Sequence, residues 1–269
     1  MSISQEVKNR FLYNAHYVLD SVIPLQKVSK FKEDGTITPE EFIESVDLLI
    51  LKCPSWSWVS GLEKKQKGYL PRNKQFIIIK GVPCHKRYNV NTHMYIKNDN
   101  DLFIVNQLDI KEQGQGQGQE QGHGQMDIDL DFFEEPDLEN DVFTNVDVDV
   151  DSNSNIKKCR TYDIIVTYDN YYRCARVWLT GYSEDQRPLT QKEIFEDISE
   201  EYRNTTVTYE MHPHLDSYYV SIHPCKHANT MKIMIDRLEN IRPDKYMFVF
   251  LKFIQTIIPT IEYDWTFSV

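Results

Sequence analysis

Cys225 is the residue whose type and setting point most directly to chemistry. It follows His223 and Pro224 and precedes Lys226 and His227, where a strand-like pattern gives way to a helical one. The amino end of a helix carries partial positive charge and unpaired N–H donors, which favour a thiolate over a thiol. Two neighbouring imidazoles add to the polarity of this position. The sequence therefore predicts that Cys225 is a nucleophile.

Two other interpretations of this region stay open at the level of the residues. Cys225 could be a small buried hydrophobe, as many cysteines without a disulfide are. The nearby histidines could instead form a zinc site with it, although no Cys-x-x-Cys or His-x-x-x-His pair completes such a set. We expect no metal and no cofactor. The zinc ligands in that alternative would be His212, His214, His223, Cys225 and His227.

Composition predicts a globular protein with one irregular part. The chain has 269 residues, of which 41% are hydrophobic and 12% aromatic, enough to bury a sizeable core. Five scattered cysteines and no secretory signal pattern favour a reducing compartment, and we expect the cytosol. The most apolar run, 246–258, contains Lys252 and Gln255 and is shorter than the ~20 residues of a spanning helix, so no transmembrane segment is expected.

The charge distribution locates the irregular part. Residues 126–151 hold 11 acidic side chains and no Lys or Arg, which equals the formal net charge of −11. A Gln/Gly run over 112–125, with five of the ten glycines, lies directly before it. Such segments bury too little apolar surface to offset the entropy lost on ordering. We expect 106–157 to be a flexible insertion, either a docking segment that folds on binding or a tolerated loop expansion.

The remaining chain predicts an α+β fold. Apolar residues at near-helical spacing predict an amphipathic helix in residues 1–23, and Thr38 with Glu41 forms a capping-box pattern for a helix over 39–52. Runs rich in β-branched and aromatic residues predict strands at 74–80, 160–168, 171–180, 205–210 and 218–222. Further helices are expected over 190–201, 226–240 and 244–258. Helices and antiparallel strands in this order favour an α+β core over a parallel sheet.

These residues resemble a known family, the ubiquitin-conjugating-like enzymes of autophagy that join a ubiquitin-like modifier to phosphatidylethanolamine. The matching blocks occur in family order on both sides of 106–157, and His-Pro-Cys and Ile-Pro-Thr-Ile-Glu-Tyr-Asp are the most specific. The resemblance implies a ubiquitin-conjugating-enzyme-like core, an antiparallel sheet flanked by helices, over 24–105 and 158–269. The blocks are Tyr69–Gln75, Val82–Arg87, Arg160–Asp163, Val177–Gly181, Glu196–Ser199, Glu210–Leu215, His223–Ala228, Phe250–Phe253 and Ile258–Asp264.

The resemblance implies a two-step acyl transfer through Cys225. The thiol takes the modifier from an activating enzyme as a thioester, and the amine of phosphatidylethanolamine then attacks the carbonyl. The attack needs support for the oxyanion and a route for a proton. Ordinary ubiquitin-conjugating enzymes use an Asn from a His-Pro-Asn motif, which is absent here, and the resemblance points instead to Thr206, with Thr208 as the alternative. His214 and His227 are candidates for proton transfer.

The resemblance also implies contacts with partners and membranes. An enzyme whose acceptor is a lipid must stay on a bilayer, so the apolar stripe of residues 1–23 is expected to insert there. The acidic residues 126–139 are expected to bind the activating enzyme, and an aromatic-x-x-aliphatic motif at 143–146 the modifier. The residues concerned are Ile3, Val7, Phe11, Val18 and Val22 for the membrane, Asp129, Leu130, Phe132, Phe133 and Leu138 for the activating enzyme, and Phe143 and Val146 for the modifier.

Other partners and other classes of function follow from the same comparison. The autophagy conjugate that acts as a ligase is a further expected partner, and the protein is expected in the cytoplasm and transiently on autophagic membranes. Nucleic acid is not expected, because basic patches with interleaved aromatic residues are missing from the sequence. The alternatives are a cysteine hydrolase, which would need an orienting Asn or Asp, and a catalytically restrained adaptor of the same fold. Cys53, Cys84, Cys159 and Cys174 lack the setting of Cys225 and are expected to be structural.

Overall fold

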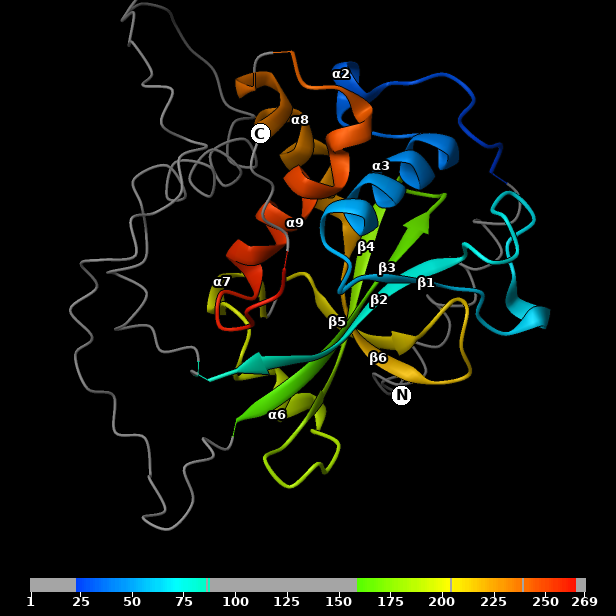
Figure 1. Ribbon diagram of the computed structural model, residues 1–269. Helices are drawn as coiled ribbons and strands as arrows, with labels where there is room; N and C mark the ends of the chain where they lie inside the picture. Colours follow the sequence, from blue (N-terminus) through cyan, green and yellow to red (C-terminus); the bar gives the residue numbers. More distant parts are fainter. Residues whose placement is uncertain (1–22, 86, 88–158, 204, 239, 265–269) are drawn as a thin grey trace, which may run out of the picture.

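Six antiparallel strands form one sheet in the described part of the chain (Figure 1). The computed structural model describes residues 23–85, 87, 159–203, 205–238 and 240–264. The strand order is β1-β2-β3-β4-β6-β5, and it places β5 at one edge and β1 at the other. The strands are β1 Ser57–Val59, β2 Phe76–Cys84, β3 Arg160–Asp169, β4 Cys174–Tyr182, β5 Val207–Met211 and β6 Tyr218–Ile222.

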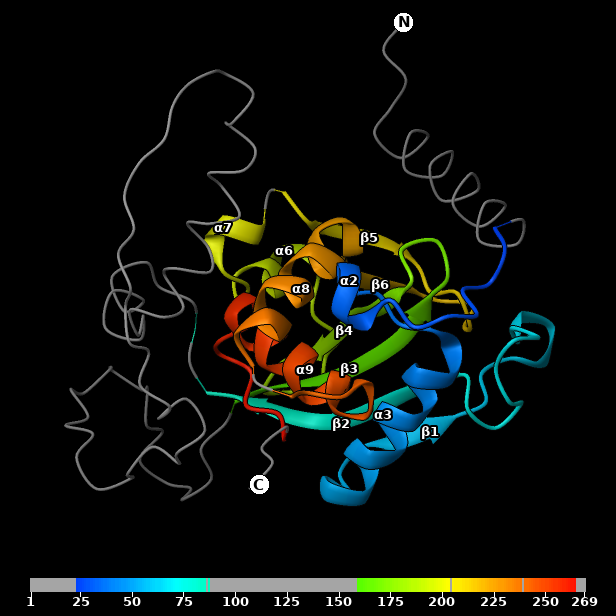
Figure 2. The same ribbon diagram turned by 90° about the horizontal axis from the view of Figure 1, so that it is seen from above.

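Helices cover one face of this sheet. Figures 1 and 2 show α3, α8 and α9 gathered on the same side, and α9 lies nearly wholly inside the core. The predicted α+β class is confirmed. The helices are α2 Phe31–Asp34, α3 Pro39–Lys52, α6 Gln191–Phe195, α7 Glu200–Arg203, α8 His227–Arg237 and α9 Tyr246–Ile257, with 3-10 turns η1 Glu63–Lys65, η3 Pro224–Lys226 and η4 Pro243–Lys245. No helix within these described ranges is long and apolar enough to span a membrane.

The two faces of the sheet have different cores. On β4, alternate residues Ala175, Val177 and Leu179 point to the helices and join the main hydrophobic cluster. Trp178 points the other way and joins a smaller cluster with Phe76 and Ile165. Side chains of a strand alternate between faces, so Arg176 shares the face of Trp178, which is called the outer face below. The first face holds the main core, and the outer face holds buried polar groups as well.

Strands β2 and β3 join the two described parts of the chain. Cys84, near the end of the first part, pairs with Arg160, near the start of the second. Nine pairs of residues then align β3 with β4, from Thr161–Tyr182 to Asp169–Cys174. Both parts therefore contribute to one sheet.

The start of α3 follows the predicted pattern. Thr38 Oγ1 accepts the N–H of Glu41, and a Glu41 carboxylate oxygen accepts the N–H of Thr38 at 2.8 Å, which is a complete capping box. Pro39 occupies the first helical position, where its missing N–H is not needed. The helix over 39–52 is confirmed at both ends.

The helix predicted over 190–201 is wrong in its middle. The chain forms α6 and α7, with residues 196–199 between them outside a helix. Ile198 and Asp197 are fully buried, and the N–H of Ser199 donates to the carbonyl of Ile257 at 2.9 Å instead of within a helix. Tertiary contacts of this segment therefore override its helical pattern.

The turn between β3 and β4 is also longer than predicted. The strands predicted over 160–168 and 171–180 leave only Asp169 and Asn170 between them. In the structure Asp169 pairs with Cys174, so the turn comprises residues 170–173. Arg173 adopts a left-handed conformation with φ 54°, and the Asp169 carboxylate accepts the N–H of Tyr172 at 3.1 Å. This carboxylate closes the turn and shortens the strand that was expected to start at Tyr171.

Residues 1–22 and 88–158 lie outside the described residues. The amphipathic helix, the flexible insertion and all predicted membrane, activating-enzyme and modifier contacts fall there, so these remain predictions.

Candidate functional site

Cys225 lies in the connection between strand β6 of the sheet and helix α8 of the layer that covers it. Strand β6 ends at Ile222, the 3-10 turn η3 begins at Pro224, and α8 follows directly from it. All five cysteines are within the described residues, and Cys225 is the exposed one. It lies in the first turn of the helical segment that continues into α8.

His223 fixes the backbone on both sides of the loop. Its N–H donates to the carbonyl of Thr206 at 2.6 Å, and its Nδ1 accepts the N–H of Cys225 at 3.3 Å. The ring of Tyr172 meets the His223 ring edge-on, with centroids 5.3 Å apart. The thiol is therefore presented by a loop that Thr206, just before β5, and Tyr172, in the β3–β4 turn, both contact.

Burial separates three of the other cysteines from this site, while Cys159 is partly exposed. It raises the pKa of Cys53 to about 12 and that of Cys84 to about 11, and it also raises the pKa of the fully buried Cys174 well above its usual value. These three thiols stay protonated at neutral pH. Cys225 is exposed and lies at a helix start, so the site has one accessible thiol suited to nucleophilic attack.

Thr206 is close to the loop in the structure. It precedes β5 and is 5% exposed, and its carbonyl accepts the His223 N–H described above. Its hydroxyl Oγ1 lies 3.4 Å from the carbonyl of Tyr202, so in this conformation it donates there. Thr208, the alternative, instead donates to the carboxylate of Glu210 on the outer face. The structure thus brings Thr206, and not the Thr208 hydroxyl, to the backbone of the Cys225 loop.

His214 does not lie beside Cys225. Met211 pairs with Tyr218 at the far end of the β5–β6 hairpin, while Val207 pairs with Ile222 at the end that leads to Cys225. His214 belongs to the connection at the far end, where its carbonyl accepts the N–H of Leu62 at 3.0 Å. The predicted proximity of His214 to the thiol is therefore corrected, because the hairpin separates them by its full length.

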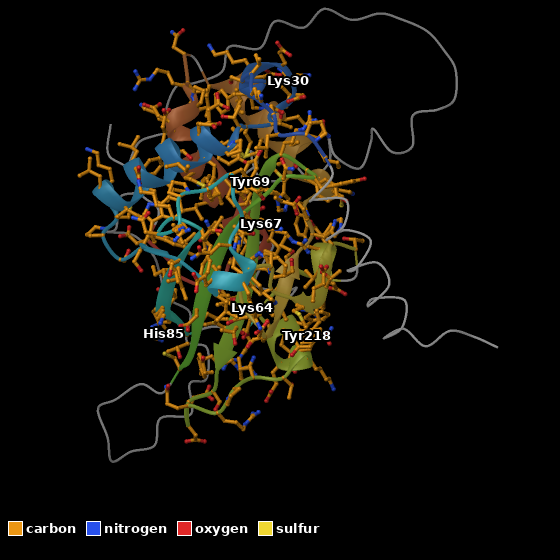
Figure 3. All side chains as sticks on the ribbon, turned by 90° about the vertical axis from the view of Figure 1, so that its right-hand side faces the viewer. Lys30, Lys64, Lys67, Tyr69, His85 and Tyr218 are labelled. Atoms are coloured by element: carbon orange, nitrogen blue, oxygen red, sulfur yellow. The ribbon has the colours of Figure 1, made fainter. Side chains whose placement is uncertain are left out.

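The connection that carries His214 is held by the η1 segment. Lys64 and Lys65 lie 2.6 and 3.0 Å from the carboxylate of Asp216, and Figure 3 shows Lys64 and Tyr218 on the same side of the molecule. Burial lowers the pKa of His212 to about 2 and that of His214 to about 3. Both rings are neutral at physiological pH and pack against Phe76.

His227 follows the thiol closely but points into the core. Its Nδ1 lies 3.0 Å from the carbonyl of Ala175, so it must carry the proton and donate, and its ring packs against Phe250 and Phe253. Burial lowers its pKa to about 3. The candidate ligands for zinc thus lie at the two ends of the β5–β6 hairpin and in the core. In the described ranges no three His, Cys, Asp or Glu side chains form a metal-binding group.

A group of buried charges near the site was not predicted. Arg176 is 4% exposed, and it pairs with Glu210 and with Asp169, the residue that closes the turn carrying Tyr172. The sequence signal for it was a single Arg within the apolar strand run 174–179, which was interpreted only as strand. Pairing partners on separate strands cannot be assigned from spacing alone.

The described site can be compared with known proteins. Residues 41–265 match the family model described as the autophagocytosis-associated protein, active-site domain. "Autophagy-related protein 3" of Arabidopsis thaliana is 38% identical over 89% of this chain and 90% of its own length, and that of Dictyostelium discoideum is 34% identical over 92% and 94%. "Autophagy-related protein 3" of Schizosaccharomyces pombe is 32% identical over 92% and 94%. The matched region contains the sheet, the helical layer and the Cys225 loop.

Proposed function

Because the chain belongs to the autophagy-related protein 3 family of ubiquitin-conjugating-like enzymes, we propose that Cys225 carries a ubiquitin-like autophagy modifier as a thioester and transfers it to phosphatidylethanolamine. The observation that supports this assignment is the exposed position of Cys225 in the first turn after β6. Among the five cysteines it alone combines exposure with a helix start.

The first proposed step is an exchange of thioesters. The Cys225 thiolate attacks the carbonyl of the modifier that an activating enzyme holds as a thioester. A new carbon–sulfur bond forms to Cys225, and the bond to the activating enzyme breaks, so that its thiolate leaves. The reaction is nearly balanced in energy, because one thioester replaces another. The exposure of Cys225 gives a protein-sized donor access to the sulfur.

The second proposed step forms an amide. The amine nitrogen of phosphatidylethanolamine attacks the thioester carbonyl, the carbon–sulfur bond breaks, and Cys225 leaves as a thiolate while the amine loses a proton. We assign Thr206 to support the oxyanion. Its hydroxyl would have to leave the carbonyl of Tyr202, 3.4 Å away, to reach the reacting carbonyl. His214 has no part in this proposal, because it lies at the other end of the hairpin.

The partner and membrane assignments rest on the sequence. The apolar stripe of residues 1–23 is proposed to hold the enzyme on autophagic membranes, and the acidic residues 126–139 to bind the activating enzyme. The motif at 143–146 is proposed to bind the modifier. The protein would then act in the cytoplasm and visit membranes transiently.

The test is a reconstituted conjugation reaction. The protein is incubated with activating enzyme, ATP, modifier and phosphatidylethanolamine liposomes, and products are resolved with and without reductant. Wild type should give a reductant-sensitive adduct and a lipidated modifier, and Cys225→Ala neither. Cys225→Ser should trap a reductant-resistant oxygen ester. If wild type forms no adduct while the activating enzyme charges itself, the proposal fails, and hydrolysis of thioesters or a non-catalytic adaptor role would be tested next.

A further inference from the structure

The outer face of the sheet holds a buried ion cluster close to the Cys225 loop. Arg176 Nη2 lies 2.9 Å from the Glu210 carboxylate, and Nη1 lies 3.6 Å from that of Asp169. Its Nε donates to the hydroxyl of Ser221 at 2.8 Å, and the guanidinium lies 4.3 Å from the centre of the Trp178 ring. One buried cation therefore connects β3, β4, β5 and β6.

The strand register places this cluster next to the catalytic loop. Val177 pairs with Ile222, and Trp178 pairs with Ser221. If the same ladder continued by one pair, Arg176 would face His223. Continuing the pairing of Val207 with Ile222 in the same way brings Thr206 to His223, and the hydrogen bond between their backbones is present. Arg176 therefore follows the last pair between β4 and β6, on the side that leads to the Cys225 loop.

A chain of contacts links the cluster to the thiol. The Asp169 carboxylate that pairs with Arg176 also accepts the N–H of Tyr172 at 3.1 Å. The ring of Tyr172 meets the ring of His223, whose Nδ1 accepts the N–H of Cys225 at 3.3 Å. Each contact fixes the position of the next group. A substitution of Arg176 can therefore shift the Cys225 sulfur, although Arg176 contacts neither substrate.

The energetics of the cluster favour a role beyond stability. Burying charged groups costs several kcal/mol for each ion, and replacing buried ion pairs with apolar residues is often neutral or stabilising. Burial by itself would raise the pKa of Glu210, but the charge of Arg176 and the hydrogen bonds from Thr208 and Arg176 together lower it. Two carboxylates thus lie around one buried guanidinium, an arrangement that restricts geometry more than it stabilises the fold.

We propose that Arg176, with Asp169 and Glu210, is a positioning residue that holds the Tyr172–His223 contact and thereby the orientation of Cys225 for acyl transfer. The proposal rests on the proposed function only in taking Cys225 as the reacting thiol. Arg176 touches neither substrate in this scheme. Its effect is expected on the rate of transfer from a loaded Cys225 and not on the binding of the activating enzyme.

The test compares variants at three positions of the chain, Tyr172, Arg176 and Ser221. Tyr172→Ala removes the ring that meets His223, while Tyr172→Phe keeps the ring and removes only the hydroxyl. Arg176→Lys keeps the charge but loses the planar fork that meets two carboxylates. Ser221→Ala is the control within the cluster, because Ser221 contacts Arg176 but not Asp169, Tyr172 or His223 in the contacts described. Each variant is first checked for a cooperative unfolding transition.

Two rates are measured for each folded variant. The first is single-turnover discharge of the preformed thioester, expected to fall about 10- to 100-fold in Tyr172→Ala and Arg176→Lys, because small misplacements carry penalties of that size. The KM for loading from the activating enzyme should stay within about 2-fold of wild type. Tyr172→Phe and Ser221→Ala should retain transfer. The second rate is alkylation of Cys225 by iodoacetamide across pH, which needs no modifier.

The pH dependence of alkylation distinguishes a positioning role of Arg176 from an electrostatic one. It also tests this role independently of the proposed function. A positioning role changes the limiting rate at high pH, whereas a purely electrostatic role only moves the midpoint of the profile and would overturn the proposal. Equal discharge in wild type and Tyr172→Ala would also overturn it. If wild-type protein never accepted a modifier, the proposed function would fail, yet a changed limiting rate of alkylation would still support the link from Arg176 to Cys225.

Discussion

The carboxylate of Asp197 lies 2.9 Å from the guanidinium of Arg160, and the Asp197 side chain is fully buried. The same carboxylate accepts the hydroxyl of Tyr162, and its other oxygen lies 3.7 Å from Arg87. Arg87 and Arg160 flank residues 88–158 along the chain. Asp197, between α6 and α7, therefore ties both ends of that stretch to the core.

Asp197→Asn is expected to destabilise the protein strongly. The substitution leaves Arg160 without its buried counter-charge, and losing one partner of a buried pair costs about 3 to 5 kcal/mol. Glu196→Gln is the matched control, since Glu196 contacts the same guanidinium at 3.1 Å but is 47% exposed. Exposed pairs contribute less than about 1 kcal/mol. Urea unfolding measures both, and similar losses for the two variants would contradict the argument.

Three glycines allow a graded test of backbone strain and packing. Gly35 has φ 76°, and a Cβ there would lie 2.2 Å from the carbonyl oxygen of Ala228 in α8. Gly81 has φ 66° with open space around it, and Gly68 has neither constraint. Left-handed conformations cost other residues roughly 1 kcal/mol, and overpacking adds about 1 to 3 kcal/mol.

The three alanine variants should therefore differ in their free energies of unfolding. Gly68→Ala should leave the unfolding free energy nearly unchanged, Gly81→Ala should lower it moderately, and Gly35→Ala should lower it most. Thermal and urea unfolding of the three variants provide the measurement. A Gly35→Ala protein as stable as Gly68→Ala would show that Gly35 does not lie against the carbonyl of Ala228 in α8.

Stability is expected to fall below pH 6.5. Burial lowers the pKa of His212 to about 2 and those of His214 and His227 to about 3, from 6.5 when unfolded. The unfolded chain then binds more protons than the folded one, so the stabilisation is complete above pH 6.5 and is lost progressively as pH falls towards 3. Each ring should cost about 2 kcal/mol at pH 5 relative to pH 8.

Urea unfolding at pH 8, 6 and 5 checks this expectation. His214→Phe keeps a ring against Phe76 and removes one titrating group, so its stability should depend less steeply on pH whatever its absolute value. An unchanged slope would mean that His214 is not buried in the neutral form.

Thiol labelling should distinguish the cysteines in the native state. N-ethylmaleimide should modify Cys225 first, because it is exposed. Cys53, Cys84 and Cys174 are buried, and burial raises the pKa of each, so they should react only after unfolding. Mass spectrometry of digests gives the order, and Cys225→Ser should remove the fastest phase. Early labelling of Cys174 would indicate that the β3–β4 turn opens.

Much of the fold was predictable from local patterns. The capping box at Thr38 and the helical pattern of 246–257 depend on neighbours in sequence, and both agree with the structure. The interrupted helix around Asp197 was not predictable, because its cause is a carboxylate bound to Arg160 and Tyr162 on another strand. Local propensity cannot report such contacts.

The candidate site was also only partly predictable from the sequence. Cys225 was identified from its immediate sequence and Thr206 from the family resemblance, and the structure places Thr206 against the backbone of the Cys225 loop. His214 shares a short motif with His212, but motif spacing did not reveal that the β5–β6 hairpin carries it away from the thiol. Arg176 and Asp169 come together only through the register of β3 and β4.

The pairing of Cys84 with Arg160 has a consequence for how the protein could be taken apart. Residues on one side of 88–158 supply β1 and β2, and residues on the other supply the strands from β3 to β6 and the Cys225 loop. Two polypeptides divided within 88–158 would each carry part of a single sheet, with matching hydrogen-bonding edges on β2 and β3. Co-expressed fragments should reassemble by pairing β2 with β3. The enzyme could then be reconstituted from two fragments, and its activity would depend on their association.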